Sequence, residues 1–137
     1  MSFDPIRDYP LGSRRPDLVS TLGGTPLAEV TLEAVRAGRI SAHDARATPE
    51  TLRWQAAVAS AAGREPLAES LERAAELALV SDGELLEIYT SLRPGRSTAA
   101  QLESWAVRLD SYAAVRTAAF VREAAAVYEQ RGLLARA

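Results

Sequence analysis

The sequence predicts an all-α protein: an open antiparallel helical bundle with an irregular N-terminal arm. Its 137 residues are 47% hydrophobic and 25% charged, which is the composition of one compact globular domain. Alanine, the strongest helix former, fills 27 positions. After residue 24, glycine and proline occur mainly at the boundaries of apolar periodic segments, which favours helices joined by short loops. We therefore expect a single domain, with the arm at 1–24 and the bundle at 25–137.

The arm shows no sustained helical or strand period. Its prolines and glycines interrupt regular structure. It also carries large apolar side chains, which a merely solvated linker does not need. These side chains are Phe3, Ile6, Tyr9, Leu11, Leu18, Val19 and Leu22. We expect the arm to be ordered against a surface of this chain or of a partner, and Tyr9 to make an interface contact.

Two helix starts follow the arm. Thr31 has the side chain of an N-cap for a short helix that Gly38 ends. Thr48, followed by proline and glutamate, begins a longer helix that we expect to run to Gly63. This helix has few large apolar residues and many alanines, so neighbouring helices can approach it closely.

Four amphipathic segments make up the rest of the chain. Pro66 opens the first, and Ser81 has capping-box spacing for the second. The third begins at Thr98, which has Gln101 three residues later and again suits a capping box. The last segment, 114–128, carries apolar groups on more than one side, which predicts burial against two surfaces.

The composition excludes several kinds of active site. There is no cysteine, no lysine and a single histidine, so a thiol nucleophile, a Schiff-base lysine and a two-histidine metal site cannot form. We expect His43 to be an ordinary surface residue. Glutamates at helical spacing have arginines between them, which indicates a salt-bridged or solvated face rather than a metal site. These residues are Glu65, Glu69, Glu72 and Glu76, with Arg64 and Arg73.

Charge and hydropathy argue against two classes of partner. The net charge is −2, whereas proteins held to nucleic acid by phosphate contacts usually have a basic excess. No stretch approaches the roughly 20 apolar residues of a membrane span, and the first residues do not have the pattern of a secretory signal. We therefore expect a cytoplasmic protein with no nucleic-acid or membrane partner.

Several strings along the chain, in their order and spacing, match one family. They are ATPETLRWQA at 47–56, AGR at 62–64, LERAAEL at 71–77, LEIY at 86–89, LRP at 92–94, RST at 96–98 and AFVREAA at 119–125. With these strings the chain closely resembles the small (gamma) subunit of adenosylcobalamin-dependent diol and glycerol dehydratases. The similarity begins near Asp8 and continues to about Arg131.

The resemblance implies an accessory subunit without an active site of its own. In this family, large, medium and small subunits assemble as a dimer of heterotrimers, and the large subunit performs the radical conversion of 1,2-diols such as propane-1,2-diol or glycerol to aldehydes. Adenosylcobalamin lies between the large and medium subunits, and the small subunit packs mainly on the large one. The resemblance therefore transfers no catalytic, cofactor-binding or metal-binding residue to this chain.

Some relatives linked to bacterial microcompartments carry an N-terminal extension, whereas about seven residues precede Asp8 here. We therefore do not expect association with a microcompartment. Spacing and polarity suggest interface residues for packing on the large subunit. The candidates are Tyr9, Leu11, Arg53, Gln55, Arg73, Tyr89, Arg93, Arg96, Arg122 and Glu123.

Two questions stay open from the sequence. Trp54 and Trp105 each lie on an apolar helical stripe, where core filling is the simpler interpretation and an interface anchor the alternative. The alternative function is a free-standing helical interaction module or regulator derived from the same family.

Overall fold

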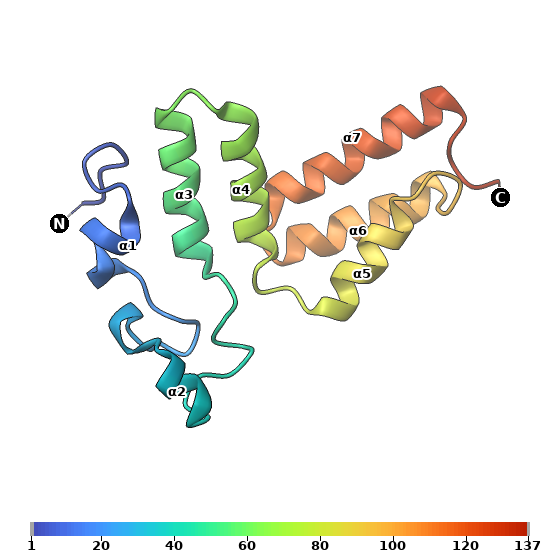
Figure 1. Ribbon diagram of the computed structural model, residues 1–137. Coiled ribbons are helices and arrows are strands. Elements are labelled where there is room, and N and C mark those ends of the chain that lie inside the picture. Colours follow the sequence, from blue (N-terminus) through green and yellow to red (C-terminus); the bar gives the residue numbers. More distant parts are fainter. Residues whose placement is uncertain (1, 137) are drawn as a thin grey trace. The chain divides into compact units, whose positions relative to one another are not determined.

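The computed structural model describes residues 2–136, and every regular element in that range is a helix (Figure 1). This confirms the predicted all-α class. From α3 onward, short connections join each helix to the next. Their bounds are α1 Leu11–Arg14, η1 Pro16–Leu18, η2 Leu27–Glu29, α2 Leu32–Arg36, α3 Pro49–Ala61, α4 Glu65–Leu77, α5 Asp82–Ser91, α6 Ala99–Ser111 and α7 Val115–Arg131, where η marks a 3-10 helix.

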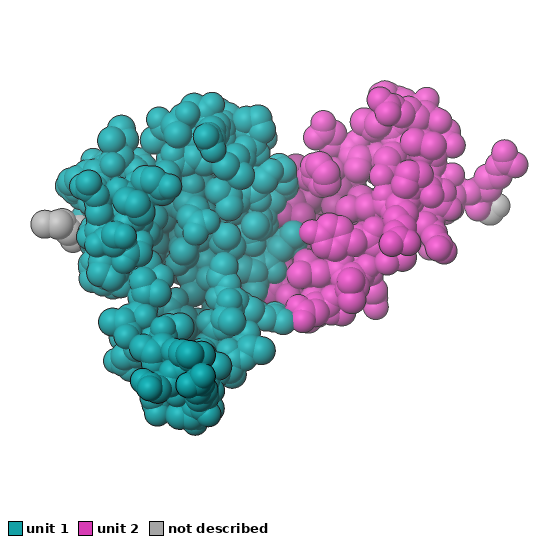
Figure 2. All heavy atoms as spheres, viewed as in Figure 1, with its two compact units in different colours: residues 1–78 teal, residues 79–137 magenta. Residues whose placement is uncertain are grey.

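The chain divides into two compact units, residues 1–78 and 79–137 (Figure 2). The first unit contains α1 to α4 and the second contains α5 to α7. The predicted division into an arm at 1–24 and one bundle at 25–137 stays a prediction.

Side-chain caps explain where four of the helices begin. In each case the cap oxygen accepts a hydrogen bond from the backbone N–H three residues later, which satisfies one of the free donors of the first turn. The capping residues are Thr31, Thr48, Ser81 and Thr98. At Thr98 the capping box is complete, because the Thr98 N–H also donates to Oε1 of Gln101 over 2.9 Å. These positions confirm the starts predicted from the sequence.

Small residues pack α3 against α4 in the first unit. Ala56 and Ala59 on α3 are buried, as are Ala68 and Ala75 on α4. Because alanine lets two helix backbones approach closely, this hairpin has little volume for large side chains between its helices. Gly63, with φ of 72°, provides the left-handed residue that ends α3 two positions after Ala61.

The second unit is built on the antiparallel pair α6 and α7. Leu102 and Leu109 of α6 and Val121 of α7 are its largest fully buried side chains. Two further apolar residues of α7, Val115 and Phe120, lie outside the buried face and are exposed at 62% and 46%. Apolar residues therefore lie on more than one side of α7, as predicted. Within the described residues, the buried face of this helix is the one that carries Ala118 and Val121.

The N-terminal arm is ordered, as expected, but it is not irregular throughout. It contains the single turn α1, in which the N–H groups of Arg14 and Arg15 donate to the carbonyls of Pro10 and Leu11. A four-residue helix is too short to leave a periodic pattern in the sequence, so hydropathy could not reveal it. Leu11 is the buried residue of this turn, at 9% exposed.

Candidate subunit interface

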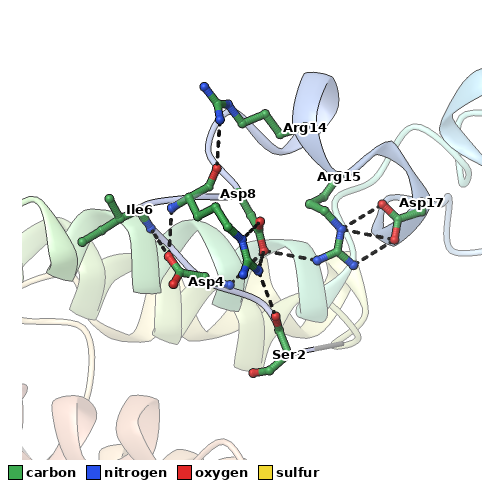
Figure 3. A network of polar contacts seen from close by, with 8 residues as sticks. Ser2, Asp4, Ile6, Asp8, Arg14, Arg15 and Asp17 are labelled. Carbon is green, nitrogen blue, oxygen red and sulfur yellow. Dashed lines mark hydrogen bonds and ion pairs between the residues drawn. The ribbon is translucent and has the colours of Figure 1, made fainter.

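A buried carboxylate organises the N-terminal arm (Figure 3). Asp8 is 4% exposed and accepts four hydrogen bonds. Arg7 donates to both carboxylate oxygens, over 2.7 and 2.9 Å, and Nη1 of Arg15 donates over 3.2 Å. The backbone N–H of Asp4 donates to Oδ2 over 2.9 Å. We call these four residues the Asp8 cluster.

Electrostatics favour the ionised form of Asp8. The hydrogen bond from the Arg7 side chain, followed by the backbone hydrogen bond from Asp4, holds the pKa of the Asp8 carboxyl well below its usual value. Arg15 extends the cluster, because its Nη2 is also 2.8 Å from Oδ2 of Asp17. The arm therefore folds back on itself through paired charges, which fixes the positions of the apolar side chains between them.

The arm borders an apolar groove in the first unit, which we call the arm groove. Its volume is about 770 Å³. Tyr9 and Leu11 line it from the arm, and Gln55 lines it from α3. The other lining residues are Pro5, Ile6, Gly12, Val58, Ala59, Ala61, Ala62, Arg64, Leu67 and Leu71. The structure thus brings three of the interface candidates together at one site.

A smaller pocket lies between α5 and α6 in the second unit, and we call it the α5–α6 pocket. It has a volume of about 380 Å³. Most of its lining residues are of polar types, and they include Arg96, one of the interface candidates. The lining residues are Thr90, Ser91, Arg96, Ser97, Gln101, Ser104 and Trp105.

Arg122 is engaged within the second unit. Its Nη2 lies 2.9 Å from Oε1 of Glu103 and 2.8 Å from Oδ2 of Asp110, so it links α7 to α6. The hydrogen bonds to Glu103 and then to Asp110 raise the pKa of the Arg122 guanidinium above its ordinary value. A comparable link joins α5 to α6, where Glu84 accepts hydrogen bonds from Tyr112 and Arg108.

The remaining candidates do not gather at one pocket. Tyr89 is 63% exposed on α5, and Arg93 follows that helix on the surface. Arg53 and Glu123 are exposed on α3 and α7. Arg73 is half-buried on α4 and donates from Nη2 to the Ser70 hydroxyl over 3.3 Å. All of these roles at an interface stay predictions.

Both tryptophans are half-buried rather than enclosed in a core. The Trp54 ring lies 5.8 Å from the Phe3 ring, centroid to centroid. The Trp105 indole donates from Nε1 to the Ser91 hydroxyl over 2.9 Å. Each side chain therefore contacts its own unit and is partly accessible to solvent.

Sequence reasoning missed the Asp8 cluster and the hydroxyls of the α5–α6 pocket. In the sequence, Asp8 marks only the start of the family similarity. A signal for the cluster was present in the sequence. Asp8 follows Arg7 directly and precedes Arg15 by seven residues, and such neighbours can form ion pairs. The pocket left no such signal, since the hydroxyl and amide groups within residues 90–105 are common at helix ends and on exposed helix faces.

Within residues 2–136, no group of three or more His, Cys, Asp or Glu residues is placed to hold a metal ion. None of the helices in that range combines the length and apolar character needed to cross a bilayer. His43 is exposed in the turn region between α2 and α3.

Comparison with known proteins gives consistent matches over nearly the whole chain. The sequence pattern of the family described as "Dehydratase small subunit" matches residues 5–135. The propanediol dehydratase small subunit of Citrobacter freundii is 50% identical over 127 residues, which are 92% of this chain and 74% of that protein. The protein of the same name from Salmonella typhimurium strain LT2 is 49% identical over 127 residues, with 92% and 73% covered.

Proposed function

Because the chain belongs to the dehydratase small-subunit family, we propose that it is the small, non-catalytic subunit of an adenosylcobalamin-dependent diol or glycerol dehydratase. The observation that carries this proposal is the identity of about half of all aligned residues with two propanediol dehydratase small subunits. The identity extends over 92% of the chain. In this proposal the chain assembles with large and medium subunits, as a dimer of heterotrimers.

The cofactor and the chemistry belong to the partner subunits in this proposal. Adenosylcobalamin, when bound there, supplies the radical that starts the dehydration. The one imidazole of this chain, His43, is exposed in a turn and does not fit the role of a cobalt ligand in a cobalamin site. The role of this chain is then to support the assembly rather than to hold the reacting groups.

The exposed surface supports a role in assembly. Large apolar side chains remain exposed on both units, and most of the surface that lines the arm groove is apolar. Permanent interfaces are typically poor in lysine, aspartate and glutamate and rich in aromatic residues and arginine. Tyr9 and Tyr89, at 56% and 63% exposed, fit this description.

The test is co-expression of this chain with candidate large and medium subunits. Size-exclusion chromatography would follow the assembly, and an adenosylcobalamin-dependent aldehyde assay would follow the activity, each with and without this chain. Co-elution together with loss of activity on omission is the expected result. Separate elution with unchanged activity would overturn the proposal in favour of the free-standing helical module, which the comparisons do not favour.

A further inference from the structure

The α5–α6 pocket has the chemistry of a carboxylate receptor. We propose that it accepts an acidic side chain of the partner subunit, whose carboxylate pairs with Arg96 when the two subunits assemble. This inference rests on the proposed function, since it requires a partner subunit. It adds to that function a specific point of contact on the second unit.

The first observation is the charge of the pocket. Arg96 is exposed, and no carboxylate is among the residues that line the pocket with it. Within residues 2–136, the Arg96 guanidinium has no hydrogen bond or ion pair, whereas Arg108 and Arg122 in the same unit are both paired with carboxylates. The site therefore presents one uncompensated positive charge, which an anionic group complements.

The second observation is a nearly buried serine at the pocket wall, Ser97. Ser97 is only 6% exposed and lines the pocket, and its hydroxyl has no hydrogen-bond partner within residues 2–136. No fully buried side-chain oxygen in that range lacks a partner, so the small accessible part of Ser97 includes its hydroxyl oxygen. A bound carboxylate would accept the hydrogen bond that this hydroxyl has free to donate.

Neighbouring groups also present donors rather than acceptors. The Ser91 oxygen already accepts a hydrogen bond from Trp105 Nε1, so its proton is free to donate. Oε1 of Gln101 accepts from the Thr98 N–H, which leaves the amide NH₂ group available. Two donors of the lining are committed, since Trp105 Nε1 donates to Ser91 and the Ser104 hydroxyl donates to the carbonyl of Ala100 over 3.0 Å. The balance of free donors favours an anion.

The surroundings favour a protein side chain as the occupant. The pocket is small, about 380 Å³, and Tyr89 lies exposed immediately before the lining residue Thr90. Arg93, also exposed, follows on the same stretch. Arginines in small pockets are frequent interface hot spots, in which the surrounding contacts exclude water from the charged pair.

The absence of lysine from this chain allows a sharp test. Arg96→Lys introduces the only ε-amine of the chain at the pocket. In the assembled complex, a zero-length carbodiimide reagent joins an amine to a carboxylate that is already in ion-pair contact with it. We expect a cross-link from position 96 to one Asp or Glu of the partner subunit, located by mass spectrometry of the peptides. Arg39→Lys, at an exposed position in the first unit, is the matched control and should give no such link.

A second variant measures how strongly the pair contributes. Arg96→Met keeps much of the side-chain volume and removes the charge, and we expect it to weaken assembly at least about tenfold, with a smaller effect at high salt. An assembled complex without a cross-link at position 96, equal linking from position 39, or unchanged affinity of Arg96→Met would each overturn the inference. If the unmodified chain itself does not assemble, the proposed function fails instead.

Discussion

Asp8 illustrates how one residue can organise a segment that has little regular structure. Its carboxylate joins Asp4, Arg7 and Arg15, which together span residues 4–15 of the arm. Hydrogen bonds between ionised partners are stronger than neutral ones, and this carboxylate is almost completely removed from water. The position of Tyr9, the next residue, depends on this cluster.

Replacing Asp8 should loosen the arm in a pH-dependent way. Asp8→Asn keeps the shape but removes the charge, and we expect a melting temperature about 2–6 °C lower at pH 7. Because the pKa of Asp8 is lowered by folding, its contribution to stability is present above the pKa of the unfolded chain, near 4, and is lost as the pH falls below that value. The difference between the two proteins should therefore shrink below about pH 4 in thermal melts.

Asn at position 8 cannot titrate, so a difference that stays constant down to acidic pH would contradict the assigned role of the carboxylate. Asp17→Asn is a useful comparison. Asp17 lies at the exposed edge of the same network, with 61% of its side chain accessible, and its replacement should have a smaller effect.

Two arginines of the predicted interface differ in their surroundings and should respond differently to substitution. Arg93→Ala is expected to weaken assembly with the large subunit more than it lowers the melting temperature of the isolated chain, because Arg93 is exposed. Arg122→Met should lower the melting temperature itself, by up to about 5 °C, because Arg122 joins α6 and α7 through Glu103 and Asp110. Thermal melts and assembly titrations on both variants separate these effects. Comparable loss of both properties in Arg93→Ala would make it a fold residue.

At the scale of elements, α6 provides the clearest contrast between buried and exposed faces. Leu109 is fully buried and Val107, two residues earlier, is 56% exposed. Leu109→Ala should reduce the free energy of unfolding by about 2–5 kcal/mol, since it removes buried methyl groups and leaves a cavity. Val107→Ala should change it by less than about 0.5 kcal/mol. Urea denaturation followed by circular dichroism checks both values, and similar losses would show that the assigned faces of α6 are wrong.

Helix starts and ends could be predicted from the sequence because their determinants are local. Thr48 and Thr98 act through a backbone N–H three residues away, and Gly63 acts through its own backbone. Contacts between distant residues could not be predicted in the same way. Arg122 reaches Glu103 across 19 positions, and nothing in its own neighbourhood indicates that pairing. The same reason explains why Tyr9, Leu11 and Gln55 were predicted singly and only the structure brings them to one groove.

At the scale of the whole molecule, both units leave large apolar side chains exposed. Ile6 at 79% and Leu79 at 74% are examples from the two units, and Leu86 and Tyr89 lie together on α5 at 66% and 63%. Isolated apolar residues on a surface are ordinary, but residues three apart on one helix share a face. The exposed face of α5 is therefore a surface that a partner subunit would cover.

Tyr89→Ala tests that expectation. The side chain contributes little to the isolated chain, so the melting temperature should change by less than about 2 °C. If the partner subunit covers the face, assembly should weaken about tenfold or more, since tyrosines in interface centres are frequent hot spots. Titration of the partner subunits against the variant measures this. A variant that assembles normally would show that the α5 face remains open in the complex.

The two tryptophans give the molecule a built-in pair of optical reporters. Trp54 lies beside Phe3 in the first unit, and Trp105 lies beside Ser91 in the second, so each unit carries one indole fluorophore. Replacing Trp54 with phenylalanine would leave emission that comes from the α5–α6 pocket alone. Replacing Trp105 would leave emission that comes from the ring beside the arm. Binding of a partner, or melting of either unit, can then be followed by fluorescence without attaching a dye.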